Sequence, residues 1–141
     1  MANSQHVSFI NSITGQTVAL VWRGAGTAIF LEVGEVDDGI KPPTGEYGVG
    51  IEWSWRIEEE HSILVGSFNN DEEIESVKGL LTGQSIESVE LFGEIPELCI
   101  TFSSGRRLLS FATTNGGPEW SVRSNGTTVH FEAGRFVYEG K

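Results

Sequence analysis

The sequence predicts an α+β protein, with a mainly antiparallel sheet, in which one unit is used twice about a pseudo-two-fold axis. Two repeated motifs lead to this expectation. Gly15-Gln16-Thr17 matches Gly83-Gln84-Ser85, 68 residues further on, and Glu52-Trp53-Ser54-Trp55-Arg56 is answered 67 residues later by Glu119-Trp120-Ser121-Val122-Arg123. Repeats that recur in the same order at nearly one offset indicate a duplicated supersecondary unit.

A single domain over residues 1–141 is expected, with repeats at about 4–69 and 70–140. A chain of 141 residues with 38% hydrophobic residues is long enough to form one core, whereas either half alone is small for this. Eighteen Gly against 4 Pro indicate many turns, as in a strand-rich fold. Each half should hold about one helix and four strands, and a sheet covered on one face by helices fits best.

The helix of the second half has the clearer signals. Asn70 and Glu73 form a capping-box-like start, and Ile74, Val77 and Leu81 follow as one apolar stripe. By the repeat, residues 5–13 should form the helix of the first half. Their β-branched and aromatic side chains argue for a strand instead, so both alternatives stay open.

The strands are expected from apolar alternation and from turn residues between the runs. The expected ranges are 17–23, 27–33, 51–58, 61–68, 85–92, 97–102, 107–112, 119–123 and 128–138, with a loop at 37–45. Within 51–58 the alternation places Trp53 and Trp55 on the inward face, and Trp53 is the expected core counterpart of Trp120. Asn125-Gly126 predicts a tight hairpin turn.

The charge of the chain restricts its function. A net charge of −11 repels nucleic acid and anionic membranes and would attract a basic protein partner, although plain solubility explains it equally well. The first residues do not form a signal peptide, and no run approaches the length of a membrane span. A cytoplasmic location is therefore expected, with the single Cys99 as a buried, inert thiol.

Four charged residues in the repeated motif, Glu52, Arg56, Glu119 and Arg123, are the candidate pocket. If the two strands run antiparallel about the pseudo-dyad, Glu52 could oppose Arg123, and Arg56 could oppose Glu119. Such cross-strand pairs contribute about 0.2–1 kcal/mol each and would simply join the halves. The functional alternative is a polar pocket at the dyad with two Arg for an anion.

The case for an enzyme is weak, because the sequence singles out no catalytic group. It has no nucleophile elbow, no phosphate-binding loop and no metal-ligand spacing among its three His, so neither a metal nor a cofactor is expected. The remaining acidic clusters are most often solvated turns, but they are also the candidate face for a basic partner. They are Glu58, Glu59 and Glu60, followed by Asp71, Glu72 and Glu73.

Several phrases of the chain resemble a family of small bacterial proteins with no established activity. They are Trp22-Arg23-Gly24 through Phe30-Leu31-Glu32, Glu52-Trp53-Ser54-Trp55-Arg56, Leu91-Phe92-Gly93 through Pro96-Glu97-Leu98, Ser103-Ser104-Gly105 and Pro118-Glu119-Trp120. The strand-turn-strand that ends in Glu-Trp is also loosely similar to immunity-type proteins that neutralise bacterial toxins. The resemblance implies no catalytic residues.

Three functional hypotheses follow. The first is a non-catalytic cytosolic binding protein whose acidic surface meets a basic protein partner, in an immunity-like role. The second is a small-molecule-binding protein or enzyme with its site at the pseudo-dyad between the two Glu-Trp-Ser-x-Arg strands. The third is a homodimer formed through an exposed sheet edge or an apolar patch.

Overall fold

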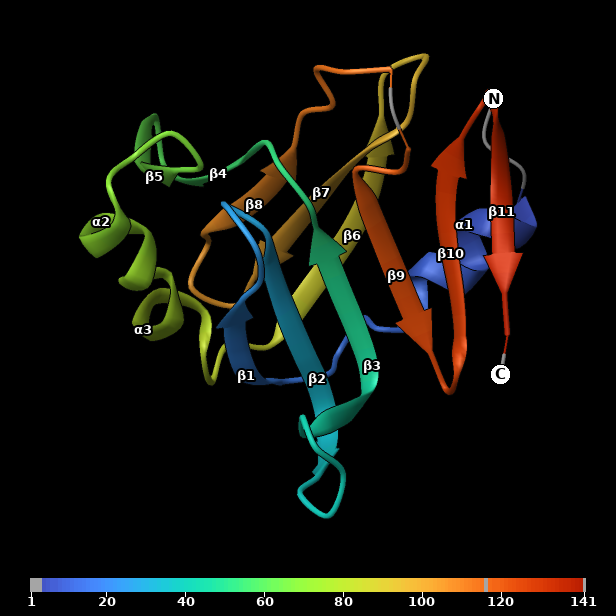
Figure 1. The fold of residues 1–141 in the computed structure, drawn as a ribbon, viewed down its shortest axis with the longest axis horizontal. Helices are drawn as coiled ribbons and strands as arrows, with labels where there is room; N and C mark the ends of the chain where they lie inside the picture. Colours follow the sequence, from blue (N-terminus) through green and yellow to red (C-terminus); the bar gives the residue numbers. More distant parts are fainter. Residues whose placement is uncertain (1–3, 116, 141) are drawn as a thin grey trace.

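A computed structural model describes residues 4–115 and 117–140, which form two antiparallel sheets and three short helices (Figure 1). The elements in chain order are α1 (Ser4–Asn11), β1 (Val18–Arg23), β2 (Ile29–Asp37), β3 (Thr44–Ile51), β4 (Trp55–Glu59), β5 (Ser62–Gly66), α2 (Asp71–Glu75), α3 (Val77–Leu81), β6 (Ile86–Phe92), β7 (Glu97–Phe102), β8 (Arg107–Ser110), β9 (Trp120–Ser124), β10 (Thr127–Glu132) and β11 (Arg135–Glu139). The expected α+β class with mainly antiparallel pairing is confirmed. The single helix-covered sheet was too simple, because two sheets are present.

The chain crosses between the two sheets twice. The larger sheet has the order β1-β2-β3-β9-β10-β11, and the smaller one has the order β5-β4-β8-β7-β6. After β3 the chain therefore leaves the larger sheet to build β4 and β5, and after β8 it returns to build β9, β10 and β11. One cluster of buried apolar side chains draws on both sheets and on all three helices, so both halves of the sequence build the same core.

The two Gly-Gln-Thr/Ser motifs lie side by side where β1 and β6 begin. Thr17 and Ser85 form an isolated antiparallel bridge. The backbone hydrogen bonds around it come in matching pairs: Gly15 N–H to Ile86 O (2.7 Å) and Gly83 N–H to Val18 O (2.8 Å), then Val18 N–H to Gln84 O (2.8 Å) and Ile86 N–H to Gln16 O (2.9 Å). This seam connects the first strands of the two sheets.

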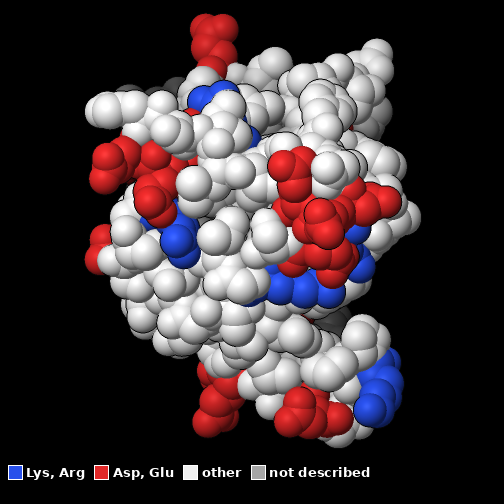
Figure 2. Space-filling model, turned by 90° about the vertical axis from the view of Figure 1, so that its left-hand side faces the viewer, with Lys and Arg blue, Asp and Glu red and all other residues white. Residues whose placement is uncertain are grey.

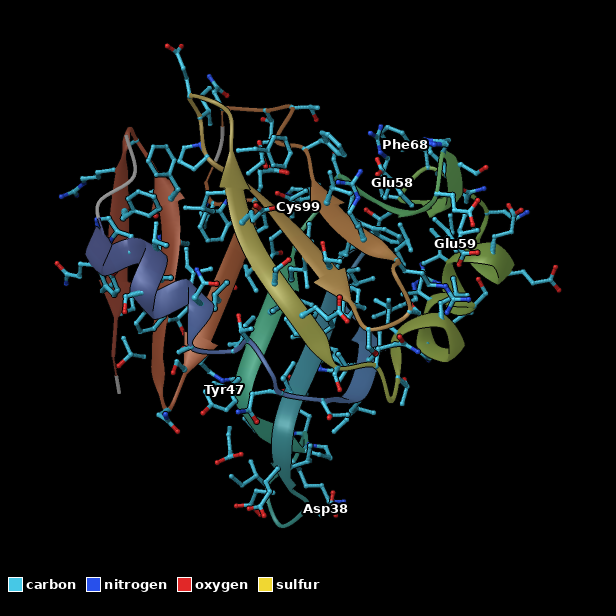
Figure 3. The ribbon with its side chains drawn as sticks, turned by 180° about the vertical axis from the view of Figure 1, so that it is seen from behind. Asp38, Tyr47, Glu58, Glu59, Phe68 and Cys99 are labelled. Carbon is cyan, nitrogen blue, oxygen red and sulfur yellow. The ribbon has the colours of Figure 1, made fainter. Side chains whose placement is uncertain are left out.

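The segment at residues 5–13, left open by its composition, is largely helical. Its helix α1 contacts β6 and β11. On β11 the His6 ring stacks on Phe136 at 4.1 Å, and His6 Nδ1 lies 2.6 Å from the Tyr138 hydroxyl (Figures 1 and 3). Ile10 is fully buried. Tertiary packing of this apolar side outweighs the weak helix propensity of the β-branched residues.

The expected helix of the second half is present as two short helices, α2 and α3, that meet at Ser76. Asn70 is the N-cap, and its side chain accepts a hydrogen bond from the Glu73 N–H at 2.9 Å, as predicted. The stripe of Ile74, Val77 and Leu81 is buried against the sheets.

The expected strand at 51–58 is interrupted, because residues 52–54 carry the chain from one sheet to the other. Trp53 is consequently 50% exposed, and its assignment to the core was wrong. Trp55 is buried instead, and its indole N–H donates to Thr27 O at 2.7 Å, as the indole of Trp120 donates to Pro96 O at 2.9 Å. Trp55 is thus the residue whose environment matches that of Trp120.

Two further differences concern strands that alternation did not predict. The Gly-rich β3 pairs with both β2 and β9, and it had no strand prediction. Residues 128–138 are a hairpin of β10 and β11 rather than one strand, with a turn at Ala133 and Gly134, whose φ angles are 52° and 80°. The tight turn at Asn125 and Gly126 joins β9 to β10, as predicted.

Candidate functional site

A hollow of about 500 Å³ lies at the end of the sandwich that is uppermost in Figure 1. Three connections meet there: the β6–β7 turn, the β8–β9 connection and the β10–β11 turn. The described lining residues are Glu94, Ile95, Pro96, Glu97, Ala112, Thr114, Asn115, Gly117, Glu119, Trp120, Phe131, Glu132, Ala133 and Gly134. The hollow therefore combines carboxylates with aromatic and aliphatic surface.

The length of the β8–β9 connection leaves this space open. It spans residues 111–119 and carries the turn-forming sequence Thr114-Asn115-Gly116-Gly117-Pro118. The connection between β3 and β4, which makes the same kind of crossing, spans only residues 52–54. There Trp53 lies close over the β1–β2 turn, with Cζ3 3.2 Å from the position that a Cβ of Gly26 would take. The Trp53 indole thus covers the short β3–β4 connection, whereas a hollow is present at the long β8–β9 connection.

Glu119 is one of the lining residues, and its carboxylate is buried without a hydrogen-bond partner among the described residues. The residue is 4% exposed, and neither Oε1 nor Oε2 receives a donor. Its backbone carbonyl is engaged, because it accepts the Glu52 N–H at 2.8 Å. Burial raises the pKa of Glu119, and the negative charges of Glu97 and Glu52 raise it further.

Glu97, by contrast, is fixed by donors. One of its oxygens accepts the Ser110 hydroxyl at 2.6 Å, and the other accepts the Ala112 N–H at 2.8 Å. The Ser110 oxygen in turn accepts the Leu98 N–H at 3.0 Å. The Glu97 carboxylate is therefore a held, charged group beside the unpartnered Glu119, and it keeps the potential of the hollow negative.

The rest of the wall is also held in place. The Trp120 indole is fixed by its bond to Pro96, and Phe131 packs edge-on against Phe136 with ring centroids 5.1 Å apart. Glu132 Oε1 lies 2.6 Å from Nε2 of the buried His130. No Lys or Arg lines the hollow among its described residues, so its electrostatics favour a cation.

Arg123, one of the predicted pocket residues, has a structural partner other than Glu52. Its guanidinium donates to Glu32 Oε1 at 2.7 Å and to the carbonyls of Gly45 (3.1 Å) and Tyr47 (3.2 Å). Glu32, 5% exposed, also accepts the Trp22 indole N–H and the Gly45 N–H, both at 2.9 Å. The expected Glu52–Arg123 pair is thus replaced by a pair within the larger sheet.

Arg56 is likewise paired away from Glu119. It bonds Glu58 at 2.6 Å and lies over the Phe111 ring with its Cζ 4.6 Å from the centroid. Burial alone would raise the pKa of Glu58, but hydrogen bonds from Arg107 and Arg56 outweigh this, so the pKa is lowered. Of the four predicted residues, only Glu119 lines the hollow described above, while Arg56 and Arg123 line two other hollows.

The acidic residues expected to face a basic partner lie around β4, β5 and α2, and Figure 2 shows that basic side chains stand among them. Glu58 pairs with Arg56 and Arg107, Glu59 with Arg106 at 2.9 Å, and Asp71 with Arg23 at 3.2 Å. The other acidic residues of this face, Glu60, Glu72 and Glu73, are exposed without a basic partner in the structure's described ion pairs. Part of this face is therefore neutralised internally.

Sequence reasoning missed the roles of Glu94, Glu97 and Glu132 in lining a hollow. The signal available was weak: two glutamates flank Ile95-Pro96 in a turn, and a glutamate directly precedes a buried Trp. Only the crossing of the chain between the sheets brings these segments together with the β10–β11 turn.

No protein-family model matches the chain, and neither the curated proteins nor the solved structures contain a match. The resemblance to small bacterial proteins therefore rests on the shared sequence phrases alone. Among the described residues, no helix has the length and apolar character needed to cross a membrane. The same residues contain no group of three or more potential metal ligands.

Proposed function

We propose that the chain is a non-catalytic binding protein whose acidic surface receives a basic protein partner, with immunity-type neutralisation as one concrete form. The observation that carries the proposal is the hollow lined by Glu94, Glu97, Glu119 and Glu132 without an opposing Lys or Arg in its described lining. Complementary charge steers such partners together and helps to select them.

The ion pairs of the molecule support this proposal, because they engage six of its nine basic side chains. Those paired with a carboxylate inside the chain are Arg23, Arg56, Lys78, Arg106, Arg107 and Arg123. The chain has only 9 Lys and Arg against 20 Asp and Glu. The surplus negative charge therefore stands on acidic side chains outside these pairs, including those at the hollow.

The experiment is capture of partners from lysate of the source cells on the immobilised protein, followed by binding measurements with the purified partner. We expect a basic protein whose affinity falls steeply as salt rises. Glu94→Lys, at the rim of the hollow, should weaken binding strongly. Glu72→Lys on α2 makes the same charge change at an exposed site elsewhere and should have little effect.

The two charge reversals also separate the two acidic faces. If Glu72→Lys abolishes binding and Glu94→Lys does not, the face around α2 receives the partner and the hollow does not. A partner whose affinity is insensitive to salt, or one that is acidic, would refute the proposal altogether.

The alternative is a small-molecule-binding protein or an enzyme, as the sequence suggested for the pseudo-dyad. The observation that favours it is the volume of the hollow, since small-molecule sites typically occupy about 300–1,000 Å³. On this alternative, a free small molecule saturates the hollow and no protein partner is retained. Glu119 would be the one residue of the predicted set to take part.

A homodimer is a further candidate, favoured by the apolar surface at the open edge of the smaller sheet. Phe68 is 94% exposed (Figure 3). Ile63 and Leu64 on the edge strand β5 are also exposed. Unpaired edge strands readily pair with another copy. Light scattering tests this: Phe68→Ser should convert a dimer into a monomer, whereas a monomeric parent protein removes the hypothesis.

We also propose that the fold arose by duplication and that the protein is bacterial and cytoplasmic. The matched hydrogen bonds at the Thr17–Ser85 seam and the matched indole bonds of Trp55 and Trp120 support two copies related by a pseudo-two-fold axis. In such a pair, each copy gives three strands to one sheet and its following strands to the other. Because of this exchange, we expect that neither half folds alone.

A further inference from the structure

We infer that the hollow around Glu119 is a receptor for a single organic cation, an ammonium or guanidinium group carried on an aliphatic stem. The inference that this cation is a Lys or Arg side chain of a basic partner rests on the proposed function. The chemistry of the hollow itself stands independently of that function.

The carboxylate of Glu119 receives no hydrogen bond from the described residues. Both oxygens are buried, and no described residue donates to either. Leaving a buried polar group without a hydrogen-bond partner has a free-energy cost, which is larger where the group is charged. An N–H donor that enters the hollow removes this cost, so the site favours donors over acceptors.

The neighbouring charges select a cation from among the possible donors. Glu97 beside Glu119 is already satisfied by Ser110 and Ala112, so its negative charge stays and repels anionic ligands. Glu94 and Glu132 add negative charge to the same lining. A neutral hydroxyl or amide could satisfy Glu119, but only a cation also gains from the other carboxylates.

The apolar part of the wall suits a stem and an aromatic contact. Ile95, Pro96 and Ala112 supply aliphatic surface, and Trp120 and Phe131 supply rings. Long basic side chains bury their methylene groups while their charged heads meet polar partners, and cations are attracted to aromatic faces. Both Glu119 oxygens are shielded from bulk water, so a small movement of the wall must accompany binding.

The test is a titration of the ¹⁵N-labelled protein with two capped amino acids, N-acetyl-lysine methylamide and N-acetyl-arginine methylamide. N-acetyl-norleucine methylamide, which has a similar stem without the charge, is the matched ligand control. We expect saturable shifts at the amides of Glu94, Ile95 and Glu97, at the Trp120 indole N–H and at the amides of 131–134, with the cationic ligands only. Binding by the norleucine compound at similar concentrations would overturn the inference.

Two variants separate the site from general electrostatics. Glu119→Gln and Glu87→Gln each remove one negative charge, but Glu87 is exposed on β6 and lies outside the hollow. We expect Glu119→Gln to weaken binding of the capped amino acid at least about tenfold, and Glu87→Gln to leave it nearly unchanged. Equal weakening by both variants would mean diffuse attraction by the acidic surface, and the receptor would be refuted.

The arms of the experiment also separate the inference from the proposed function. If the capped amino acids bind saturably but no basic protein partner is found, the cation receptor is supported and the proposed function is not. The ligand is then a free amine, and spermidine is the next probe. A basic protein that binds the parent protein and Glu119→Gln equally well supports the proposed function and refutes the receptor.

Discussion

Replacement of Arg123 by Met should destabilise the protein substantially, because it leaves the buried Glu32 carboxylate without its counterion. Glu32 keeps two neutral donors, the Trp22 indole and the Gly45 N–H. Breaking a buried ion pair from one side costs about 3–5 kcal/mol. The Arg123 side chain is 28% exposed and water can partly replace it, so we expect a loss of about 2–3 kcal/mol in the free energy of unfolding.

The assay is urea denaturation followed by Trp fluorescence, with Arg135→Met as the control. Arg135 is an exposed arginine on β11 that has no ion pair in the structure's described residues, so its loss should change stability by no more than about 0.5 kcal/mol. In the double variant Glu32→Gln/Arg123→Met, most of the cost should disappear, because the charge that needed Arg123 is gone.

The outcome decides between two roles for the Arg residues of the repeated motif. A loss below about 0.5 kcal/mol for Arg123→Met would refute the structural role and leave Arg123 free to bind a ligand. If the stability loss of the double variant equals the sum of the losses of Glu32→Gln and Arg123→Met, the two residues are not coupled. Either outcome would reopen the hollow beside Arg123 as a site.

Three further predictions concern other positions. Gly48→Ala should cost about 1–3 kcal/mol in denaturation assays, because the new Cβ would lie 2.7 Å from the Arg123 guanidinium; full stability would show that Arg123 is not held there. Asn70→Ala should cost about 1 kcal/mol through loss of the N-cap bond, and an unchanged urea midpoint would contradict it. Glu119→Gln should stabilise the protein above neutrality but much less near pH 4.5, the ordinary glutamate pKa. The raised pKa of Glu119 means that folding takes up a proton between the two pKa values, so stability is lost as pH rises through this window; a stability difference that does not grow with pH would refute it.

Much of the fold could be predicted because the signals were local. The N-cap at Asn70 and the hairpin turn at Asn125-Gly126 depend on a few adjacent residues, and both are present. The strand at 97–102 has the predicted bounds, because its apolar run ends at a turn with a glycine at φ 90°, Gly105.

The missed strand β3 shows why local signals fail elsewhere. Its glycines are needed by residues far away in sequence: the Arg123 guanidinium lies over Gly48, and the Phe30 ring lies 2.9 Å from the place of a Cβ on Gly50. A glycine in a strand often marks such a close approach, but the sequence does not say what approaches. Trp53 was misplaced for a related reason, because strict alternation continues through residues 52–54 although the chain changes sheets there.

The candidate site was predictable only in part. The repeated motif drew attention to Glu119, but it assigned Arg56 as its partner, and in the structure Arg56 pairs with Glu58 instead. The Glu119 carboxylate has no partner because the described residues of the surrounding connections place no hydrogen-bond donor near it. Such an absence depends on the path of the 111–119 connection, which no pairwise pattern in the sequence encodes.

The proposed duplication allows Glu119 to be compared with the residue at the equivalent position of the first copy. On that proposal Ser54 is its counterpart: each residue precedes a buried Trp, and each carbonyl accepts an N–H from the neighbouring strand end, Phe111 to Ser54 at 2.9 Å and Glu52 to Glu119 at 2.8 Å. The Ser54 hydroxyl lies 3.4 Å from that of Thr113, so a small polar group is satisfied at this point of the fold. The scaffold therefore does not require a carboxylate there, and a buried, unpartnered one weakens the folded state. We infer that its benefit lies outside folding, because a cation that enters the hollow would supply the partner that the described residues do not.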